Sequence, residues 1–325
     1  MLICCGLTTF DITQVVHEMP GPDQKVVATS QRATFGGPAA NAAATAAALG
    51  VPVRLVTAIG AGALAEVVRA EVLATGVDLV DVTVGAAGAA DAVVRGPAVS
   101  TVLVTGGTGE RAVVSTNATD RPAASGDAGA VGRAFDGVRS VATVGSVSVS
   151  AIGEGASGAT GSTRRPSDGG RDVLLLDGHH PRLARALAER ARELGVLVVL
   201  DGGSWKDGTA ELVRLCDAVV LSQDFRVPGG QVEHVLEDVA ALGPAFVARS
   251  RGGEPLEVLD DGRRSELPVP AAGVVVDTLG AGDVLHGAFA AEVSRGRSWE
   301  GALREASVVA SRSVTFEGAR GWIAH

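Results

Sequence analysis

Short apolar runs rich in Val, Leu and Ile alternate along this chain with longer segments rich in Ala, Arg and Glu. Continuous apolar runs are typical of strands that are buried on both faces, as in a parallel sheet. A strand followed by a helix, repeated many times, predicts an α/β fold with a doubly wound, mostly parallel sheet flanked by helices. The 325 residues fit a single domain of this kind, 1–325.

The elements follow from the apolar periodicity and from Pro and Gly at helix ends. The expected strands are Leu2–Leu7, Val53–Ile59, Val141–Gly145, Val173–Asp177, Val196–Asp201, Ala218–Ser222 and Ala245–Arg249. The expected helices are Pro38–Leu49, Ala63–Thr75, Pro181–Leu194, Val232–Leu242, Ala281–Arg295 and Trp299–Phe316.

Three segments interrupt this rhythm. Residues 11–35 and about 88–116 alternate apolar and polar side chains, which predicts half-buried strands outside the main sheet, forming a small β-strand lid. Residues 155–171 are rich in Gly, Ser and Thr, and we expect a mobile surface loop there. Pairing of the lid strands across a two-fold axis would give a homodimer, which is a further hypothesis.

The composition excludes several classes of partner. The formal net charge is −9 and aromatic residues make up 3% of the chain, so we expect no nucleic acid and no anionic membrane as a partner. No apolar run reaches membrane-spanning length, and the N-terminus lacks the basic region of a signal peptide. Cys4, Cys5 and Cys216 lie in apolar runs and predict buried free thiols, which fits a cytoplasmic location.

Only two of the 28 basic residues are lysines, Lys25 and Lys206. Neither stands in the G-x-x-x-x-G-K-[ST] spacing of a Walker-type phosphate loop, so that class of phosphate site is excluded. Neither has apolar residues on both sides that would activate it as a nucleophile. Any phosphate must therefore be bound mainly by backbone amides and arginines.

The segment Asp277-Thr-Leu-Gly-Ala-Gly-Asp283 follows an apolar run and opens a predicted helix. Gly280, Ala281 and Gly282 leave backbone N–H groups uncovered at the helix N-terminus, which makes an anion site without a lysine. Asp283 could accept the proton of a hydroxyl that attacks a bound phosphate. The alternative is that Asp283 only caps the helix.

Two weaker motifs precede it. Gly36 and Gly37 permit the close approach of a ligand or of another part of the backbone, and Asn41 offers donors and an acceptor to sugar hydroxyls. The alternative is a helix of small residues that packs tightly on the sheet. Asp11 follows the first strand, at the edge where open α/β sheets bind ligands; its alternative is a turn aspartate.

Together, in this order, these motifs resemble the ribokinase-like, or PfkB, family of carbohydrate kinases. The resemblance implies that Gly280, Ala281 and Gly282 form an anion hole at the γ-phosphate of ATP and that Asp283 is the catalytic base. It also implies that Asp11, Gly36, Gly37 and Asn41 bind the sugar, and that ATP with Mg²⁺ is the usual donor.

The resemblance implies further binding residues. The nucleotide-binding candidates are Ser222, Ser250, Gly252, Gly253 and Ser307, with Arg251 as an additional phosphate contact. Asp277, Ser313 and Gly318 match the region that binds a monovalent cation such as K⁺. The N-x-x-E segment that organises magnesium in the family appears here as Ser222-Gln-Asp-Phe225, so Asp224 is the candidate magnesium residue.

The expected function is an ATP-dependent sugar kinase. Pro38 cannot donate a hydrogen bond, which disfavours ribose, and Leu200-Asp201-Gly202 resembles the branch that acts on ketoses and 6-substituted ketoses such as sulfofructose. Arg95 is a candidate contact for an anionic substituent. We expect His179 and His180 to form a pre-helix loop, and His286 to pack on its own helix.

Two alternatives stay open. The departures at Ser222–Phe225 and Ser250 are consistent with a catalytically impaired nucleotide- or sugar-binding module. A nucleoside kinase of the same family is the other, although the shortage of aromatic residues argues against base stacking. The first strand lacks G-x-G-x-x-G, so a Rossmann-type dehydrogenase is discounted.

Overall fold

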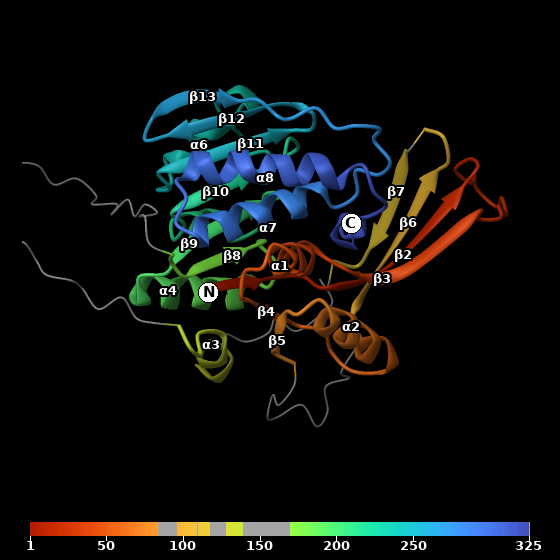
Figure 1. Cartoon of the computed structure of the whole chain (residues 1–325), viewed down its shortest axis with the longest axis horizontal. Helices are drawn as coiled ribbons and strands as arrows, with labels where there is room; N and C mark the ends of the chain where they lie inside the picture. Colours follow the sequence, from red (N-terminus) through yellow and green to blue (C-terminus); the bar gives the residue numbers. More distant parts are fainter. Residues whose placement is uncertain (84–95, 109, 118–127, 139–169, 325) are drawn as a thin grey trace, which may run out of the picture.

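The computed structural model of the chain describes residues 1–83, 96–108, 110–117, 128–138 and 170–324 (Figure 1). A nine-stranded sheet runs in the order β13-β12-β11-β10-β9-β8-β1-β4-β5, and all neighbours from β11 to β5 are parallel. Its strands are β1 (Leu2–Cys5), β4 (Val53–Thr57), β5 (Asp78–Asp81), β8 (Val173–Leu176), β9 (Leu197–Gly202), β10 (Ala218–Leu221), β11 (Phe246–Arg251), β12 (Glu254–Asp260) and β13 (Arg263–Leu267).

Helices cover both faces of this sheet. They are α1 (Pro38–Ala48), α2 (Ala63–Ala74), α3 (Ala128–Ala134), α4 (Pro181–Leu194), α5 (Thr209–Val213), α6 (Val235–Ala240), α7 (Ala281–Ser294) and α8 (Trp299–Ser313), with short 3₁₀ helices η1 (Val232–His234) and η2 (Gly321–Ala324). In β1, Leu2 and Cys4 face the layer that contains α1, α7 and α8, whereas Ile3 and Cys5 face the layer that contains α4 and α6. Both faces of β1 are therefore buried, which explains its uninterrupted apolar sequence.

The predicted fold class is confirmed, and the differences lie at the sheet edges. Neither β5 nor the antiparallel hairpin of β12 and β13 was expected from the sequence. This hairpin turns at Asp261 and Gly262, which both have positive φ, and Asp-Gly is a strong hairpin signal that was present in the sequence. The expected strand Val141–Gly145 lies outside the described residues, as does nearly all of the expected loop 155–171.

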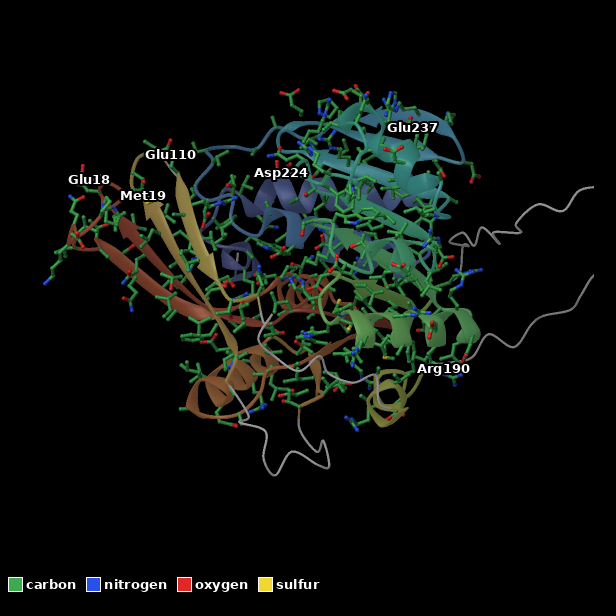
Figure 2. All side chains as sticks on the ribbon, turned by 180° about the vertical axis from the view of Figure 1, so that it is seen from behind. Glu18, Met19, Glu110, Arg190, Asp224 and Glu237 are labelled. Atoms are coloured by element: carbon green, nitrogen blue, oxygen red, sulfur yellow. The ribbon has the colours of Figure 1, made fainter. Side chains whose placement is uncertain are left out.

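A second, smaller sheet projects from one end of the molecule (Figure 1). Its order is β3-β2-β6-β7, with β2 (Thr9–Val16), β3 (Ser30–Gly36), β6 (Ala98–Thr105) and β7 (Arg111–Ser115). Figure 2 labels Glu18, Met19 and Glu110 near the outer tips of these strands. The four strands fall almost entirely within the segments 11–35 and 88–116, and their role as a lid stays a prediction.

The three cysteines are buried and free. In the parts of the chain that the structure describes, no helix combines the length and the apolar character needed to span a membrane.

Candidate active site

A cavity of about 510 Å³ lies between the smaller sheet and the carboxyl edge of the main sheet. Residues from the smaller sheet form one wall, and the N-terminal ends of α1 and α7 form the other. The segment near the C-terminus from Glu317 to Gly321 also lines the cavity and forms a third side of it. Asp11, Gly37, Asn41 and Asp283, which are distant in sequence, all line this one cavity.

The strand period of two gives the smaller sheet a polar face toward the cavity. Thr9, Asp11 and Thr13 line the cavity from β2. In the antiparallel register, Asp11 lies opposite Thr34 and Thr13 lies opposite Arg32. Neither Arg32 nor Thr34 was a sequence candidate, although the alternation of β3 would have placed both on the same face.

The Asp11 carboxylate is held in a fixed place in this wall. The Thr9 hydroxyl donates to its Oδ1 at 2.6 Å. Burial raises the pKa of Asp11, while the Thr9 hydrogen bond opposes that rise. Any Cβ at Gly36 would lie less than 3.0 Å from the Asp11 carboxylate, so Gly36 gives Asp11 its space rather than facing the cavity itself.

Gly37 turns the chain into α1. Its φ of 95° is unfavourable for other residues, and a Cβ there would come closer than 3.0 Å to the Leu7 carbonyl. The diglycine therefore brings the start of α1 against the end of β1. Asn41, one turn later, is buried and faces the cavity.

The predicted anion site lies at the start of α7. Gly280 has φ 78°, and the first intrahelical bond runs from the Val284 amide to the Gly280 carbonyl at 2.9 Å. The amides of Gly282 and Asp283 precede that bond and are free of helix partners by geometry. The Ala281 amide donates to the Thr278 carbonyl at 3.3 Å, so it contributes less to an anion hole than the sequence suggested.

Asp283 is half-buried and lies beside Asn41. The Asn41 Nδ2 donates to Asp283 Oδ2 at 2.7 Å. Burial raises the pKa of Asp283 to about 7, and the nearby Asp201 carboxylate adds to the rise, while Asn41 and His286 oppose it. A carboxyl group with a pKa near neutrality at a cavity wall has the properties of a general base.

Arg320 fixes the orientation of Asn41. Its guanidinium donates to Asn41 Oδ1, and because arginine has only donors the Asn41 amide group must face Asp283. Arg320 also donates to the Phe35 carbonyl at 2.6 Å and lies 3.5 Å above the Phe35 ring. Burial lowers its pKa to about 10. No sequence motif that we used pointed to Arg320.

Asp177 joins three elements behind the cavity. Its carboxylate accepts from the backbone amides of Leu7 at 2.7 Å, Ala39 at 3.2 Å and His179 at 2.9 Å. Burial opposes its ionisation, but the contacts with His179 outweigh that effect and hold the pKa of Asp177 well below its usual range. The pKa of His179 is raised overall: burial acts to lower it, but the contact with the Asp177 carboxylate outweighs that effect. His179 lines the cavity from the loop before α4, as predicted, with its Nδ1 3.2 Å from Asp177 Oδ1.

A family model described as the pfkB family carbohydrate kinase matches residues 1–114 and 168–323 of this chain. The chain belongs to the pfkB family of carbohydrate kinases. It is therefore a phosphotransferase with an alcohol group as acceptor.

Three relatives illustrate the similarity. The ATP-dependent ribose-1-phosphate kinase of Halopiger xanaduensis is 28% identical over 98% of this chain and 93% of its own length. The ribokinase of Thermotoga maritima has a TM-score of 0.68 at 20% identity, covering 99% of this chain and 95% of that structure. The Arabidopsis thaliana ribokinase, solved with ribose and ATP, has a TM-score of 0.67 at 21% identity, covering 98% and 93%.

In this pfkB kinase most nucleotide-binding candidates lie together at the carboxyl ends of β10 and β11. Ser250 is the penultimate residue of β11, and Gly252 and Gly253 turn the chain into β12. A Cβ at Gly252 would lie 3.8 Å from Gln223 Oε1, so this turn lies beside the Ser222–Phe225 segment. Ser222 donates to the Gly203 carbonyl at 2.9 Å. Ser307 is buried in α8 and donates to the Arg304 carbonyl at 2.7 Å.

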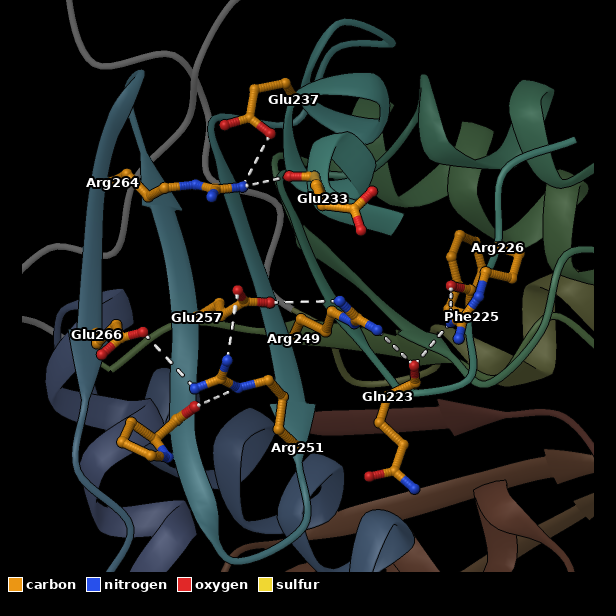
Figure 3. A network of polar contacts seen from close by, with 11 residues as sticks. Gln223, Phe225, Arg226, Glu233, Glu237, Arg249, Arg251, Glu257, Arg264 and Glu266 are labelled. Carbon is orange, nitrogen blue, oxygen red and sulfur yellow. Dashed lines mark hydrogen bonds and ion pairs between the residues drawn. The ribbon is translucent and has the colours of Figure 1, made fainter. Parts of the chain in front are cut away.

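Arginines brace this edge (Figure 3). Arg249 donates to the Gln223 carbonyl at 2.6 Å and so holds the 222–225 segment on β11. Arg251 lies 3.8 Å from Glu257 and 3.6 Å from Glu266, with its Nε donating to the Pro255 carbonyl. Glu257 and Glu266 therefore face the Arg251 guanidinium, and a contact of Arg251 with phosphate stays a prediction.

The magnesium candidate of the pfkB kinase is an exposed residue, whereas two of its monovalent-cation candidates, Asp277 and Gly318, are in contact. Asp224 is exposed at the surface after β10 (Figure 2). Asp277 accepts the Leu279 amide on Oδ1 and the Gly318 amide on Oδ2, each at 2.8 Å, and Ser313 donates to the Ala310 carbonyl. Within the described ranges, no three His, Cys, Asp or Glu side chains group as a metal site. The cation assignment to Asp277, Ser313 and Gly318 stays a prediction.

Proposed function

We propose that this protein is an ATP-dependent sugar kinase that transfers the γ-phosphate to a hydroxyl of a small carbohydrate, with a ketose or a 6-substituted ketose favoured. The observation that carries the proposal is the place of Asp283. It is a half-buried carboxylate at an amide-rich helix start, and the cavity it faces has a polar opposite wall that includes Asp11.

The reaction follows from this geometry. Asp283, ionised, accepts the proton of the sugar hydroxyl, and the resulting oxygen nucleophile bonds to the γ-phosphorus while the bond to the ADP oxygen breaks. The amides of Gly282 and Asp283 stabilise the charge on the transferred group. Asn41 orients the Asp283 carboxylate, and the smaller sheet excludes water from the cavity.

Magnesium enters this proposal with the nucleotide. Bound Mg²⁺ would neutralise charge on the phosphates of ATP. Asp224, close in sequence to Ser222 on the same segment, is one exposed carboxylate, which fits an ion that the nucleotide carries better than one that the protein holds alone. A role for K⁺ at Asp277, a homodimer through the smaller sheet and a cytoplasmic location stay predictions from the sequence.

Arg32 supports a substrate with an anionic group. It lines the cavity from β3, and its guanidinium is 3.9 Å from both Asp277 and Glu317, too far for close pairing. The similarity to a kinase named for a sugar phosphate fits the same inference. Arg95, the sequence candidate for this role, lies outside the described residues.

The cavity offers little for a nucleobase. Phe35 is the one aromatic side chain among the described residues that line it, and the Arg320 guanidinium covers a face of its ring. Hydroxyl and amide groups from Thr9, Thr13, Ser100 and Asn117 suit a polyol instead. This argues against the nucleoside kinase alternative.

A coupled ADP-release screen over ketoses, aldoses, sugar phosphates, sugar acids and nucleosides tests the proposal. We expect the highest kcat/KM with a ketose that carries an anionic group at carbon 6. We expect the variant Arg32→Gln to lose the preference for the anionic group but to keep turnover of the unsubstituted ketose. ATP binding without phosphoryl transfer to any compound would favour the impaired binding module.

The pH dependence of the reaction follows from the raised pKa of Asp283. The base acts in its ionised form, so kcat/KM should rise with pH up to about 7 and then level off. Below that pH it should fall tenfold for each pH unit as the carboxylate takes up a proton. A flat profile between pH 5 and pH 8 with the best substrate would remove Asp283 as the titrating base.

A further inference from the structure

We propose that His286 and Asp201 act as a positioning pair for the anion hole, in which the His286 ring holds the peptide bond between Gly282 and Asp283. The inference rests on the proposed function of that helix start. The sequence had suggested only that His286 packs on its own helix.

Oxygen atoms face both nitrogens of the His286 ring. Nδ1 lies 2.6 Å from the Gly282 carbonyl and 3.3 Å from Asp201 Oδ2, and Nε2 lies 3.0 Å from the Val220 carbonyl. Oxygen acceptors thus face both ring nitrogens, and Nδ1 is placed to donate to the Gly282 carbonyl when it carries a proton. The ring is 3% exposed, and these contacts fix its plane.

The Gly282 carbonyl and the Asp283 amide belong to the same planar peptide unit. Holding the carbonyl oxygen therefore fixes the direction of the Asp283 N–H group. That amide precedes the first intrahelical bond of α7 and is one of the two amides assigned to the transferred phosphate. Donation to the carbonyl also polarises the peptide, which makes its N–H a stronger donor.

The pair anchors this peptide to the middle of the main sheet. Asp201 is the penultimate residue of β9, and its register partner on β10 is Val220, which supplies the carbonyl for Nε2. The ring thus joins the first turns of α7 to two neighbouring strands at once. A histidine whose only role was core packing would not need a contact with the peptide that carries the base.

Several charged groups surround the site and bear on its readout. Two acidic groups face Asp283: Asp201 from β9 and Asp177 from the end of β8. His286 from its own helix and Arg320 from the C-terminal segment also face it, and the neutral Asn41 of α1 donates a hydrogen bond to it. Asp201 is faced in turn by His286, Asp177, Lys206 and His179. Asp201 raises the pKa of Asp283 and His286 lowers it, so the two members of the pair have opposite effects on the base.

Substitutions at His286 can separate the two ring nitrogens. Asn places a donor near the position of Nδ1, Gln places one near Nε2, and Leu removes both. We expect His286→Leu and His286→Gln to lower kcat roughly tenfold or more with little change in the KM for sugar. His286→Asn should keep most of the wild-type kcat, because its donor still reaches the Gly282 carbonyl.

The pH profile gives a second readout. Asp201→Asn should move the acid limb of the kcat/KM profile to lower pH, because a cause that raises the pKa of Asp283 is removed. His286→Leu should move it to higher pH for the opposite reason. His234→Leu, at an exposed histidine on η1, is the matched control and should change neither the rate nor the profile.

A measurement without substrate separates this inference from the proposed function. Amide hydrogen exchange over residues 280–286 of the ligand-free protein should be faster in His286→Leu and His286→Gln than in wild type and His286→Asn. If the exchange rates follow this order but the wild-type protein phosphorylates no compound in the screen, the proposed function is wrong and the positioning pair is still supported. Equal exchange in all four proteins, or equal kcat in the Asn and Gln variants, would overturn the positioning pair.

Discussion

Asp283→Asn should lower kcat by roughly 10²–10⁴-fold, the usual contribution of a general base. An amide cannot accept the sugar proton at neutral pH, whereas it preserves the shape of the side chain and leaves an oxygen for the Asn41 amide. The change also removes a half-buried carboxylate that Asp201 repels. The Tm should therefore stay the same or rise while turnover is lost, and steady-state kinetics with differential scanning calorimetry measures both.

A matched control is available in the first turn of another helix. Glu66 stands in the first turn of α2, is exposed, and does not line the cavity. Glu66→Gln makes the same carboxylate-to-amide change without touching the reaction, so its kcat should equal that of wild type. A loss of turnover in both variants, or near-wild-type turnover in Asp283→Asn with the best substrate, contradicts the assignment of the base.

Gly287→Ala should cost several kcal/mol of stability, at the upper end of about 1–3 kcal/mol for overpacking or beyond it. Gly287 is the point where α7 meets α1, and a Cβ there would lie less than 3.0 Å from the Ala42 carbonyl oxygen and Cα. Backbone atoms cannot swing aside as a side chain can, so the two helices would have to separate. Because α1 carries Asn41 and α7 carries Asp283, activity should fall along with the Tm.

Gly132→Ala is the control for this change. Gly132 is an exposed residue of α3, and its added Cβ would meet nothing within 4 Å. Alanine should stabilise that helix by up to about 1 kcal/mol, since glycine is the poorer helix former. If Gly287→Ala had the same Tm as wild type, this result would contradict the close approach of α7 to α1 at Gly287.

Much of the fold could be predicted because each parallel strand is buried on both faces and reads as a short apolar run. Strands such as Val173–Leu176 and Ala218–Leu221 are entirely buried, and the sequence shows this directly. The edge strands were missed for the converse reason. β13 is largely exposed, so its sequence is mixed and only the Asp261-Gly262 turn marks it.

The candidate site could be predicted where a local motif carries the chemistry. The helix start at Gly280–Asp283 needs a backbone conformation that favours glycine, so the glycines in the sequence indicate where it lies. No local motif predicts the role of Arg320, because that role comes from a contact with Asn41, which is 279 positions away in the chain. His286 likewise depends on strands that are far away in the sequence, and tertiary packing alone brings them together.

The most direct test of the account follows the γ-phosphate itself. With ATP labelled in that group and the best substrate from the screen, mass spectrometry of the products shows where the label goes. We predict a labelled sugar phosphate monoester in equal amount to ADP from wild type, and almost none from Asp283→Asn in the same time. Label found only in inorganic phosphate, or the same ester formed at the same rate by both proteins, would contradict a sugar kinase that works through Asp283.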